Sequence, residues 1–575
     1  MGMLRCGARS LCVLAVVACS DPLAVANSNQ PDRGRVFTNA ADLEQFVSNL
    51  YTNVHLGTLG GATVLDGGAN DGLQPQLLVA GMENVSGLAN FAMGPRGNIP
   101  RTGIANTRGS TGNVGNYRDW VVEHRAARMS VLAISALSRL TLGSPARDAR
   151  ARAFARFGQG VALGNLALAY DSAAILTEND NPEADAAVVV PLSGYRAVMT
   201  AALAALDSAI AIAAANPSAF PLPSTWISGI ALTQAQFIQL CHSYEARFQA
   251  NVARTPAERA AADWNAIIDD ANAGIKEDGQ ITMVPPPSGG WDISWVIQHF
   301  ATGSANWHQM SQFWLGMADT SGAADTSVGY DHWLATTPGL RVPFVVVTPD
   351  RRLPQGTTRA AQQANSPTPT APLAFTATPY FRNRPTGEDQ PGDPIGISQY
   401  DFYRSRAFMN ATRNGPYPVM TAAEIRLYAA EGYLRTNNIP EAARLINVSR
   451  VGKGQLVALD TTGVILADTL TAVPGGTGCV PRVPDAAAAY KRAKCGTIWD
   501  ALKWEYRMET AYTGYGMWFF AGRGWGDLPQ YTALNWAVPY QEMDTRREPF
   551  YGVGGAGGRD AAGPGNYGLF AGGVY

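Results

Sequence analysis

Apolar side chains recur at intervals of three and four residues along several separated segments of the chain, which is the pattern of amphipathic helices. The first such segment has five apolar positions at this spacing: Leu43, Phe46, Val47, Leu50 and Tyr51. We expect the helices to come in pairs, and the predicted pairs cover residues 39–142, 148–215, 233–275 and 421–450. The pattern therefore predicts a mainly α fold of irregular, tetratricopeptide-like helix pairs with long loop-rich excursions, although a fixed repeat of about 34 residues is missing.

Several predicted helices begin with a capping box, in which Ser or Thr is followed three residues later by Glu or Gln. The pairs of this kind are Thr233 with Gln236, Thr255 with Glu258, and Thr421 with Glu424. In each pair the hydroxyl is expected to accept a hydrogen bond from a free backbone N–H at the start of the helix. These starts give the predicted helix pairs defined beginnings.

A segment of different character, residues 279–414, lies between the third and fourth predicted pairs. It is rich in Pro, Gly, Thr and Ser, which favours loops, and residues 57–113 form a second loop-like region. Long loops in a folded chain are usually functional or disordered. We expect these two regions to supply a binding surface, with Asn70, Asp71 and Arg96 as polar candidates.

Tryptophans are concentrated in the first part of the 279–414 segment: Trp291, Trp295, Trp307, Trp314 and Trp333. A sugar ring presents flat C–H faces and a rim of hydroxyls, and an exposed indole offers a flat apolar platform for such a face. Packing in the core is the alternative role for a large aromatic side chain. We expect two of the five to be exposed and to contact a ligand.

The first eighteen residues have the composition of a signal peptide, with Arg5 and Arg9 followed by a short apolar run. The run ends in Val-Val-Ala before Cys19, which is a bacterial lipobox. We expect cleavage before Cys19 and acylation of its thiol, and an ordinary secretory signal is the alternative. Residues 19–36 are polar and are predicted to tether a globular region, residues 37–575, to a membrane.

No later segment is predicted to span a bilayer, because the longest alanine-rich run, residues 198–215, is interrupted by Asp207. Removing the signal leaves 42 of the 44 basic residues against 46 acidic ones. This near balance does not indicate a nucleic acid as partner. The six histidines show no zinc-binding spacing, so we expect neither a metal nor a cofactor. Glu505 and Glu509 could be read as a catalytic acid pair, but a structurally paired helix face is the favoured interpretation.

Three cysteines remain beyond Cys19. Cys241 lies on the apolar face of a predicted helix, and we expect a buried thiol there. Cys479 and Cys495 flank a proline-containing loop, and in an exported protein such a pair favours a disulfide. A zinc site is the alternative, although neither a Cys-x-x-Cys motif nor a neighbouring histidine supports it.

Two segments resemble parts of the SusD/RagB family of outer-membrane nutrient-binding lipoproteins. The first reads Met-Thr-Ala-Ala-Glu-Ile-Arg-Leu-Tyr-Ala-Ala-Glu-Gly over residues 420–432 and continues to Ile-Asn-Val-Ser-Arg over 446–450. The second reads Trp-Glu-Tyr-Arg-Met-Glu over 504–509 and is followed by Trp-Ala-Val-Pro over 536–539 and by Glu542. The lipobox, the tether and the helix pairs follow in the family's order, so the resemblance covers nearly all of the mature chain.

The resemblance implies a protein on the outer face of the outer membrane, held there by its lipid anchor. Such a protein would bind an oligosaccharide or a peptide and pass it to a SusC-like TonB-dependent transporter, without catalysing a reaction. Two alternatives remain open: a lipid-anchored glycan hydrolase, and a tetratricopeptide-like scaffold that binds only envelope proteins. The sequence does not name the ligand.

Overall fold

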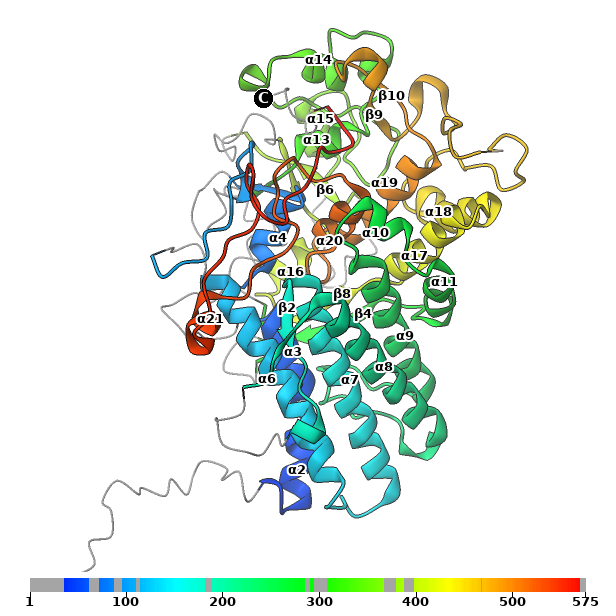
Figure 1. Ribbon diagram of the computed structural model, residues 1–575. Coiled ribbons are helices and arrows are strands. Elements are labelled where there is room, and N and C mark those ends of the chain that lie inside the picture. Colours follow the sequence, from blue (N-terminus) through cyan, green and yellow to red (C-terminus); the bar gives the residue numbers. More distant parts are fainter. Residues whose placement is uncertain are drawn as a thin grey trace, which may run out of the picture.

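The computed structural model describes residues 36–61, 72–86, 96–109, 114–180, 189–284, 290–293, 308–366, 379–386, 398–466 and 468–568. Long helices occupy one half of the molecule, and a loop-rich part with short helices and strands covers the other end (Figure 1). The prediction of a mainly α fold of irregular helix pairs is confirmed. The signal sequence, the tether and Cys19 lie outside the described residues.

The helices have the following bounds: α2 (Ala40–Ser48), α3 (Leu50–Thr58), α4 (Gln74–Ala80), α6 (Val114–Leu137), α7 (Pro145–Ala169), α8 (Tyr195–Ala215), α9 (Gln234–Asn251), α10 (Pro256–Ala260), α11 (Trp264–Ala273), α13 (Gln312–Gly316), α14 (Gly329–Ala335), α15 (Arg359–Ala364), α16 (Arg406–Asn410), α17 (Ala422–Arg435), α18 (Ile439–Gly452), α19 (Ile498–Thr510), α20 (Met517–Trp525) and α21 (Tyr540–Arg546).

The strands form antiparallel pairs: β1 (Asn84–Ser86) with β5 (His308–Met310), β2 (Ser172–Ala174) with β3 (Leu192–Gly194), β4 (Gly279–Met283) with β8 (Gly415–Met420), β6 (Phe381–Asn383) with β7 (Tyr400–Phe402), and β9 (Arg482–Pro484) with β10 (Ala493–Cys495).

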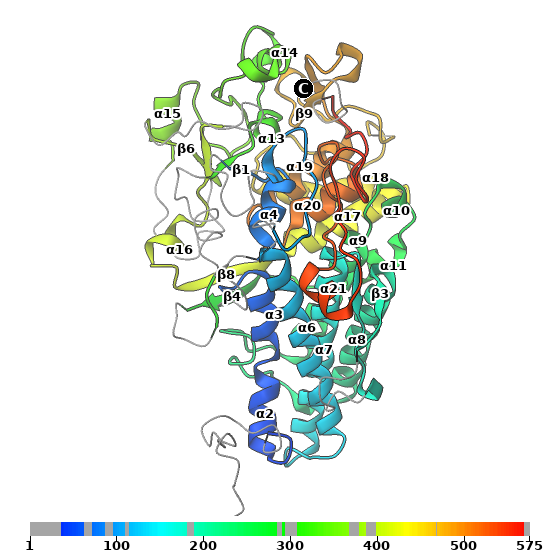
Figure 2. The ribbon, with the colours of Figure 1, turned by 60° about the vertical axis from the view of Figure 1, so that its left-hand side comes forward.

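The long helices stack largely in chain order. Helix α6 packs against α7, α7 against α8, α8 against α9, and the array continues through α11 to α17 and α18. Figure 2 shows α3, α6, α7 and α8 running side by side. Small residues allow the close approach: a Cβ at Gly160 of α7 would lie 2.7 Å from Cγ of Leu206 on α8. The alanine- and glycine-rich composition of this region is therefore a packing requirement.

Helix α8 is the one described helix that is long and apolar enough to cross a membrane by length and composition. Its apolar face is buried against its neighbours in the array, and Val198, Ala202 and Leu206 have no exposed surface. Asp207 is exposed on the opposite face. The helix therefore has the burial pattern of a bundle helix.

The predicted helix starts differ in how far each capping box is completed. Thr233 and Gln236 form the full box at the start of α9. The Thr255 hydroxyl accepts from the N–H of Glu258 at 3.2 Å, but the Glu258 carboxylate accepts from the N–H of Arg254 instead. At the start of α17 the Thr421 hydroxyl likewise accepts from the N–H of Glu424, and the Glu424 carboxylate accepts from Arg247.

Helix α17, which carries the alanine- and glutamate-rich motif, is fixed by buried ion pairs. Arg247 of α9 donates to Glu424 at 2.7 Å, and Arg259 of α10 donates to Glu431 at 2.7 Å. All four side chains are at most 6% exposed. The glutamates are seven residues apart and so lie on one face of the helix, which joins α17 to the preceding helices.

A buried arginine, Arg352, joins the loop-rich part to α19. Arg352 donates to Glu505 of α19 at 2.6 Å, to Asp350 at 2.7 Å and to Glu509 at 3.2 Å. Asp350 also accepts from the indole N–H of Trp504 at 2.9 Å. We call Arg352 and its three carboxylates the arginine clamp. Burial alone would lower the pKa of Arg352, but the carboxylates of Asp350 and Glu505 hold that pKa well above its usual range.

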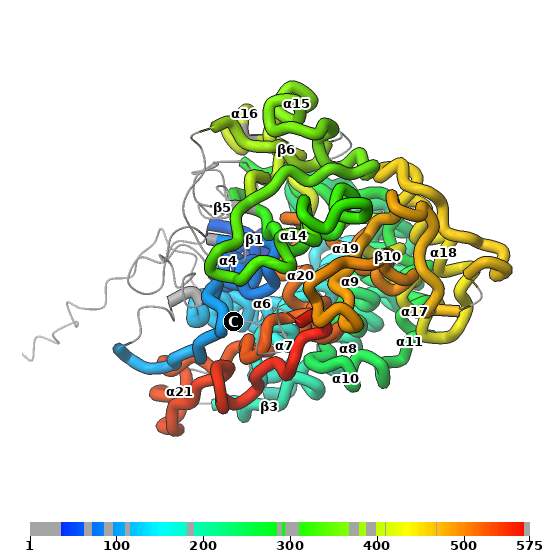
Figure 3. The backbone as a smooth tube through the Cα atoms, turned by 90° about the horizontal axis from the view of Figure 1, so that it is seen from above, coloured from blue at the N-terminus to red at the C-terminus, as the bar shows by residue number. Residues whose placement is uncertain are grey.

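Seen from above, α14, α19 and α20 lie near the centre, with α15 and α16 on one side and α17, α18 and α11 on another (Figure 3). The clamp helix α19 is thus between the stacked helices and the loop-rich part. Short regular elements lie within the two loop-rich regions. Residues 57–113 include α4 and β1, and residues 279–414 include α13 to α16.

We expect Arg352→Met to destabilise the protein by about 3–5 kcal/mol, because the buried carboxylates of Asp350 and Glu505 would lose their counter-charge. The free energy of unfolding in urea measures this. Arg444→Met is the matched control, since Arg444 pairs with Glu441 at the surface, where the arginine is 59% exposed. That change should alter the stability by less than about 1 kcal/mol. Equal small effects from both variants would contradict the clamp.

Candidate functional site

The two regions expected to bind a ligand meet in the structure. Strands β1 and β5 pair antiparallel, with Asn84 opposite Met310 and Val85 opposite Gln309. A separate contact joins the 290–293 segment to α3, because His55 Nε2 lies 2.6 Å from the carbonyl oxygen of Asp292. We call the β1–β5 pair the loop junction: residues 84–86 and 308–310.

Three of the five candidate tryptophans are core residues and do not form exposed platforms. Trp291 is 8% exposed and stacks against Tyr51. Trp333 is 2% exposed, with Arg341 Cζ 4.4 Å from its ring centroid. Trp314 is 2% exposed, and Arg507 Cζ lies 3.5 Å from its ring centroid. These three large aromatic side chains pack in the core, which is the alternative to ligand binding that the sequence left open.

The other candidates are distributed differently. Trp295, Trp307, Asn70 and Asp71 lie outside the described residues, so a role for them in binding stays a prediction. Arg96 is buried, and its Nε donates to Gln76 Oε1 at 3.4 Å. Burial lowers the pKa of Arg96 to about 10. Arg96 is therefore a structural side chain rather than a group on the surface.

Glu505 and Glu509 serve the arginine clamp. Burial raises the pKa of Glu505, even though the Arg352 guanidinium acts to lower it. A raised carboxyl pKa is also seen in catalytic acids. Here, however, both oxygens of Glu505 accept hydrogen bonds from Arg352, at 2.6 and 3.0 Å. The carboxylate is saturated by the arginine, so the structure supports the interpretation of a structurally paired helix face.

A groove with a volume of about 430 Å³ lies beside α9 and β4. Its wall combines the apolar side chains of Leu232 and Leu240 with the amides of Gln236, Gln239 and Gln280. Amides beside apolar surface suit a hydroxyl-rich ligand. The groove is a second candidate surface, away from the loop junction in sequence.

Among the described residues, one group has the composition of a metal site: His242, Glu245 and Asp270. Nδ1 of His242 lies 2.9 Å from Asp270 and 3.0 Å from Glu245. These hydrogen bonds, first to Asp270 and then to Glu245, raise the pKa of His242 to about 9. The imidazole is therefore protonated at neutral pH, and the group acts as an ion-paired link between α9 and α11.

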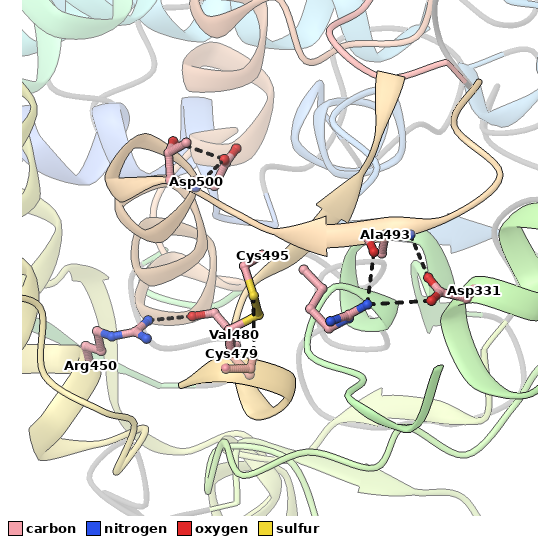
Figure 4. Close-up of a disulfide and its surroundings, with 10 residues drawn as sticks. Asp331, Arg450, Cys479, Val480, Ala493, Cys495 and Asp500 are labelled. Carbon is pink, nitrogen blue, oxygen red and sulfur yellow. Dashed lines mark hydrogen bonds and ion pairs between the residues drawn. A yellow bond between two sulfur atoms is a disulfide. The ribbon is translucent and has the colours of Figure 1, made fainter. Parts of the chain in front are cut away.

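Cys479 and Cys495 form a disulfide in the structure, with their Cα atoms 5.7 Å apart. Figure 4 shows the bond beside β9 and β10, where Arg450 donates to the carbonyl oxygen of Val480 at 2.7 Å. Cys495 ends β10 just before α19 begins. Cys241 is a buried free thiol, and burial raises its pKa well above the usual range.

No family model and no curated protein match this sequence. Solved structures do resemble the fold. A SusD superfamily protein from Bacteroides vulgatus aligns over 88% of this chain and 90% of its own, at 12% identity and a TM-score of 0.46. A second, from Bacteroides thetaiotaomicron, aligns over 84% and 89%, at 12% identity and a TM-score of 0.48. Surface glycan-binding protein A from Bacteroides uniformis aligns over 82% and 86%, at 13% identity and a TM-score of 0.44.

The two motif segments of the sequence have structural roles that the sequence alone did not assign. Glu424 and Glu431 of the first motif hold buried arginines, and Glu505 of the second holds Arg352. Arg352 was not among the candidate residues, because its partner on α19 is 153 positions away and leaves no local pattern.

We expect the globular region from Ser20 to show one reactive thiol after denaturation without reductant and three after reduction. The single thiol is Cys241. Replacing both Cys479 and Cys495 by Ala should lower the free energy of unfolding by about 3 kcal/mol, because the bond closes a loop of 16 residues. Three reactive thiols in non-reduced protein made with export would show that the bond does not form.

Proposed function

We propose that this protein is a cell-surface lipoprotein that binds an oligosaccharide and passes it to a TonB-dependent transporter in the outer membrane. The lipid on Cys19 anchors it, and residues 20–36 hold the globular region away from the membrane. It binds without chemical conversion of the ligand. The lipobox and the order of the two motif segments support the anchor and the partner.

The observation that carries the proposal is the arginine clamp. Binding surfaces formed by long loops need a rigid support, since ordering a free loop on binding costs conformational entropy. The clamp joins the loop-rich part to α19, and the β1–β5 pair joins the two expected ligand loops. The second motif of the family resemblance is therefore the part of the chain that holds the loops in place.

Trp295 and Trp307 are the proposed ligand contacts. They belong to the aromatic segment that borders the loop junction. Trp291, Trp314 and Trp333 are excluded from this role because they are buried. The groove that contains Gln239 is the alternative binding surface. Substitutions in the groove and at the two tryptophans show which surface binds the ligand.

We expect the globular region from Ser20 to be retarded in native gels that contain its polysaccharide, when a panel of polysaccharides is screened. Trp295→Ala and Trp307→Ala should each weaken binding about fivefold to two-hundredfold, the range for loss of one stacked aromatic platform. Their melting temperatures should stay close to the wild type. Trp314→Ala is the matched control, since removing a core indole lowers the melting temperature.

Gln239→Ala tests the groove in the same assay. Weaker binding by Gln239→Ala with unchanged binding by the two tryptophan variants would move the site to the groove. Release of shorter products from the bound glycan would contradict a binding protein and favour a hydrolase. If no polysaccharide retards the protein and a peptide binds instead, the ligand is a peptide and the proposed oligosaccharide is wrong.

We expect cells grown with labelled palmitate to incorporate label into the wild-type protein and not into Cys19→Ala. The thiol of Cys19 is the acylated atom in the lipobox interpretation, so the substitution removes the acceptor. Two or three acyl chains give stable membrane attachment, and the unlabelled variant should appear in the soluble fraction. Equal labelling of both proteins would contradict the anchor.

A further inference from the structure

A cavity of about 130 Å³ lies where α10 begins, where α20 ends and where the glycine-rich segment 561–566 crosses them. One buried water needs roughly 10–15 Å³ of such volume, so this cavity has room for a small polyatomic ion. Its polar walls are formed by Arg254, Arg523, Thr255 and Asn566, and no Asp or Glu lines it. The remaining wall is apolar or glycine.

Both guanidiniums are buried, with Arg523 1% and Arg254 6% exposed. Arg523 donates to the carbonyl oxygens of Leu534 at 2.5 Å and Asn251 at 3.0 Å. Arg254 donates to the carbonyl oxygen of Tyr170 at 2.5 Å. Nε of each arginine is buried without a hydrogen-bond partner. Backbone carbonyls satisfy part of each guanidinium but carry no full negative charge.

Neither arginine has a carboxylate within ion-pair distance among the described residues. The acidic side chains that act on Arg254 from further away have other partners. Glu258 accepts from Tyr195, and Asp171 accepts from Tyr551 and Arg559. Burial lowers the pKa of Arg254 to about 10, and burial with the charge of Arg254 lowers the pKa of Arg523.

This arrangement differs from that of the three arginines that are buried in ion pairs with carboxylates. Arg352, Arg247 and Arg259 each meet at least one carboxylate. An arginine stays charged at neutral pH even when buried, and a buried charge without a counter-charge is strongly unfavourable. Two such charges beside one cavity with no acidic side chain in its wall define a site that a small anion would complete.

We propose that this cavity binds a small oxyanion through Arg254 and Arg523. Sulfate, phosphate and the carboxylate of an acidic sugar share the required chemistry: a compact negative group whose oxygens accept from guanidinium N–H donors. The source is either a free inorganic ion or an acidic group on a saccharide. The proposal does not depend on the proposed function, because it follows from the charges of this cavity alone.

The test uses the globular region from Ser20 in chloride buffer, with sodium sulfate added at constant ionic strength. Wild-type protein should show a saturable rise in melting temperature of about 2 °C or more. Gly563→Asp should place a carboxylate at the cavity wall, where a Cβ at Gly563 meets nothing within 4 Å. This variant should melt higher than wild type without sulfate and lose the response. Gly563→Asn, which has the same shape without the charge, should keep the response.

Arg254→Gln should also lose the sulfate response, and Arg125→Gln, at an exposed position on α6, should keep it. Sulfate stabilises many proteins at high concentration by exclusion from their surface. An equal, non-saturating rise in wild type, Gly563→Asp and Arg254→Gln would therefore overturn the proposal. So would calorimetric titrations of wild type with sulfate, phosphate and glucuronate that all show no heat of binding.

The titrations also distinguish a free inorganic ion from an acidic saccharide as the bound ligand. Binding of glucuronate but not of glucose, lost in Gly563→Asp, would assign the cavity to an acidic saccharide. Binding of sulfate or phosphate without glucuronate would assign it to an inorganic ion. Neither result affects the interpretation of the polysaccharide screen, because Trp295 and Trp307, the proposed ligand contacts, lie in a different part of the sequence.

Discussion

The buried Arg352, Arg247 and Arg259 each need the negative charge of a carboxylate, and this requirement organises the parts of the fold that they join. The arginine clamp is the strongest example, since Arg352 and its partners Asp350 and Glu505 have no exposed side-chain surface. Such a pair adds little net stability, because desolvation offsets much of the attraction. Its effect is on specificity: any packing of the loop-rich part that separates the charges is strongly unfavourable. The loops are therefore held in one position on α19.

The same requirement acts in the helical array. Glu424 and Glu431 on α17 bind Arg247 and Arg259, so this helix is positioned by charge as well as by shape. Small residues permit the close packing of α7 and α8, but they specify relative position poorly. Directional, charge-assisted hydrogen bonds supply that specification. A stack of helix pairs without a sequence repeat needs such ion pairs between neighbouring helices to fix their relative positions.

The helices of the array could be predicted from the sequence because their signals are local. Apolar spacing and caps such as Thr233 and Thr255 lie within one turn of what they specify. Helix α4 was missed because it is short and all seven of its residues are buried, so it has no exposed polar face to reveal a period. The clamp was missed because its charges come together only through the tertiary fold. For Trp314, composition could not separate a core indole from an exposed one, since the deciding contact is Arg507 on a distant helix.

The β1–β5 pair also constrains the order in which the protein folds. Residues 84 and 310, which are opposite each other in it, are 226 positions apart. The helices α6 to α9 lie between them in sequence, and each can pack on its predecessor as soon as it forms. Contacts over such a sequence separation form late, because a long chain segment must first be ordered. The loop junction is therefore completed only after the array exists, and mutations that slow the stacking of α6 to α9 would delay the binding surface without touching it.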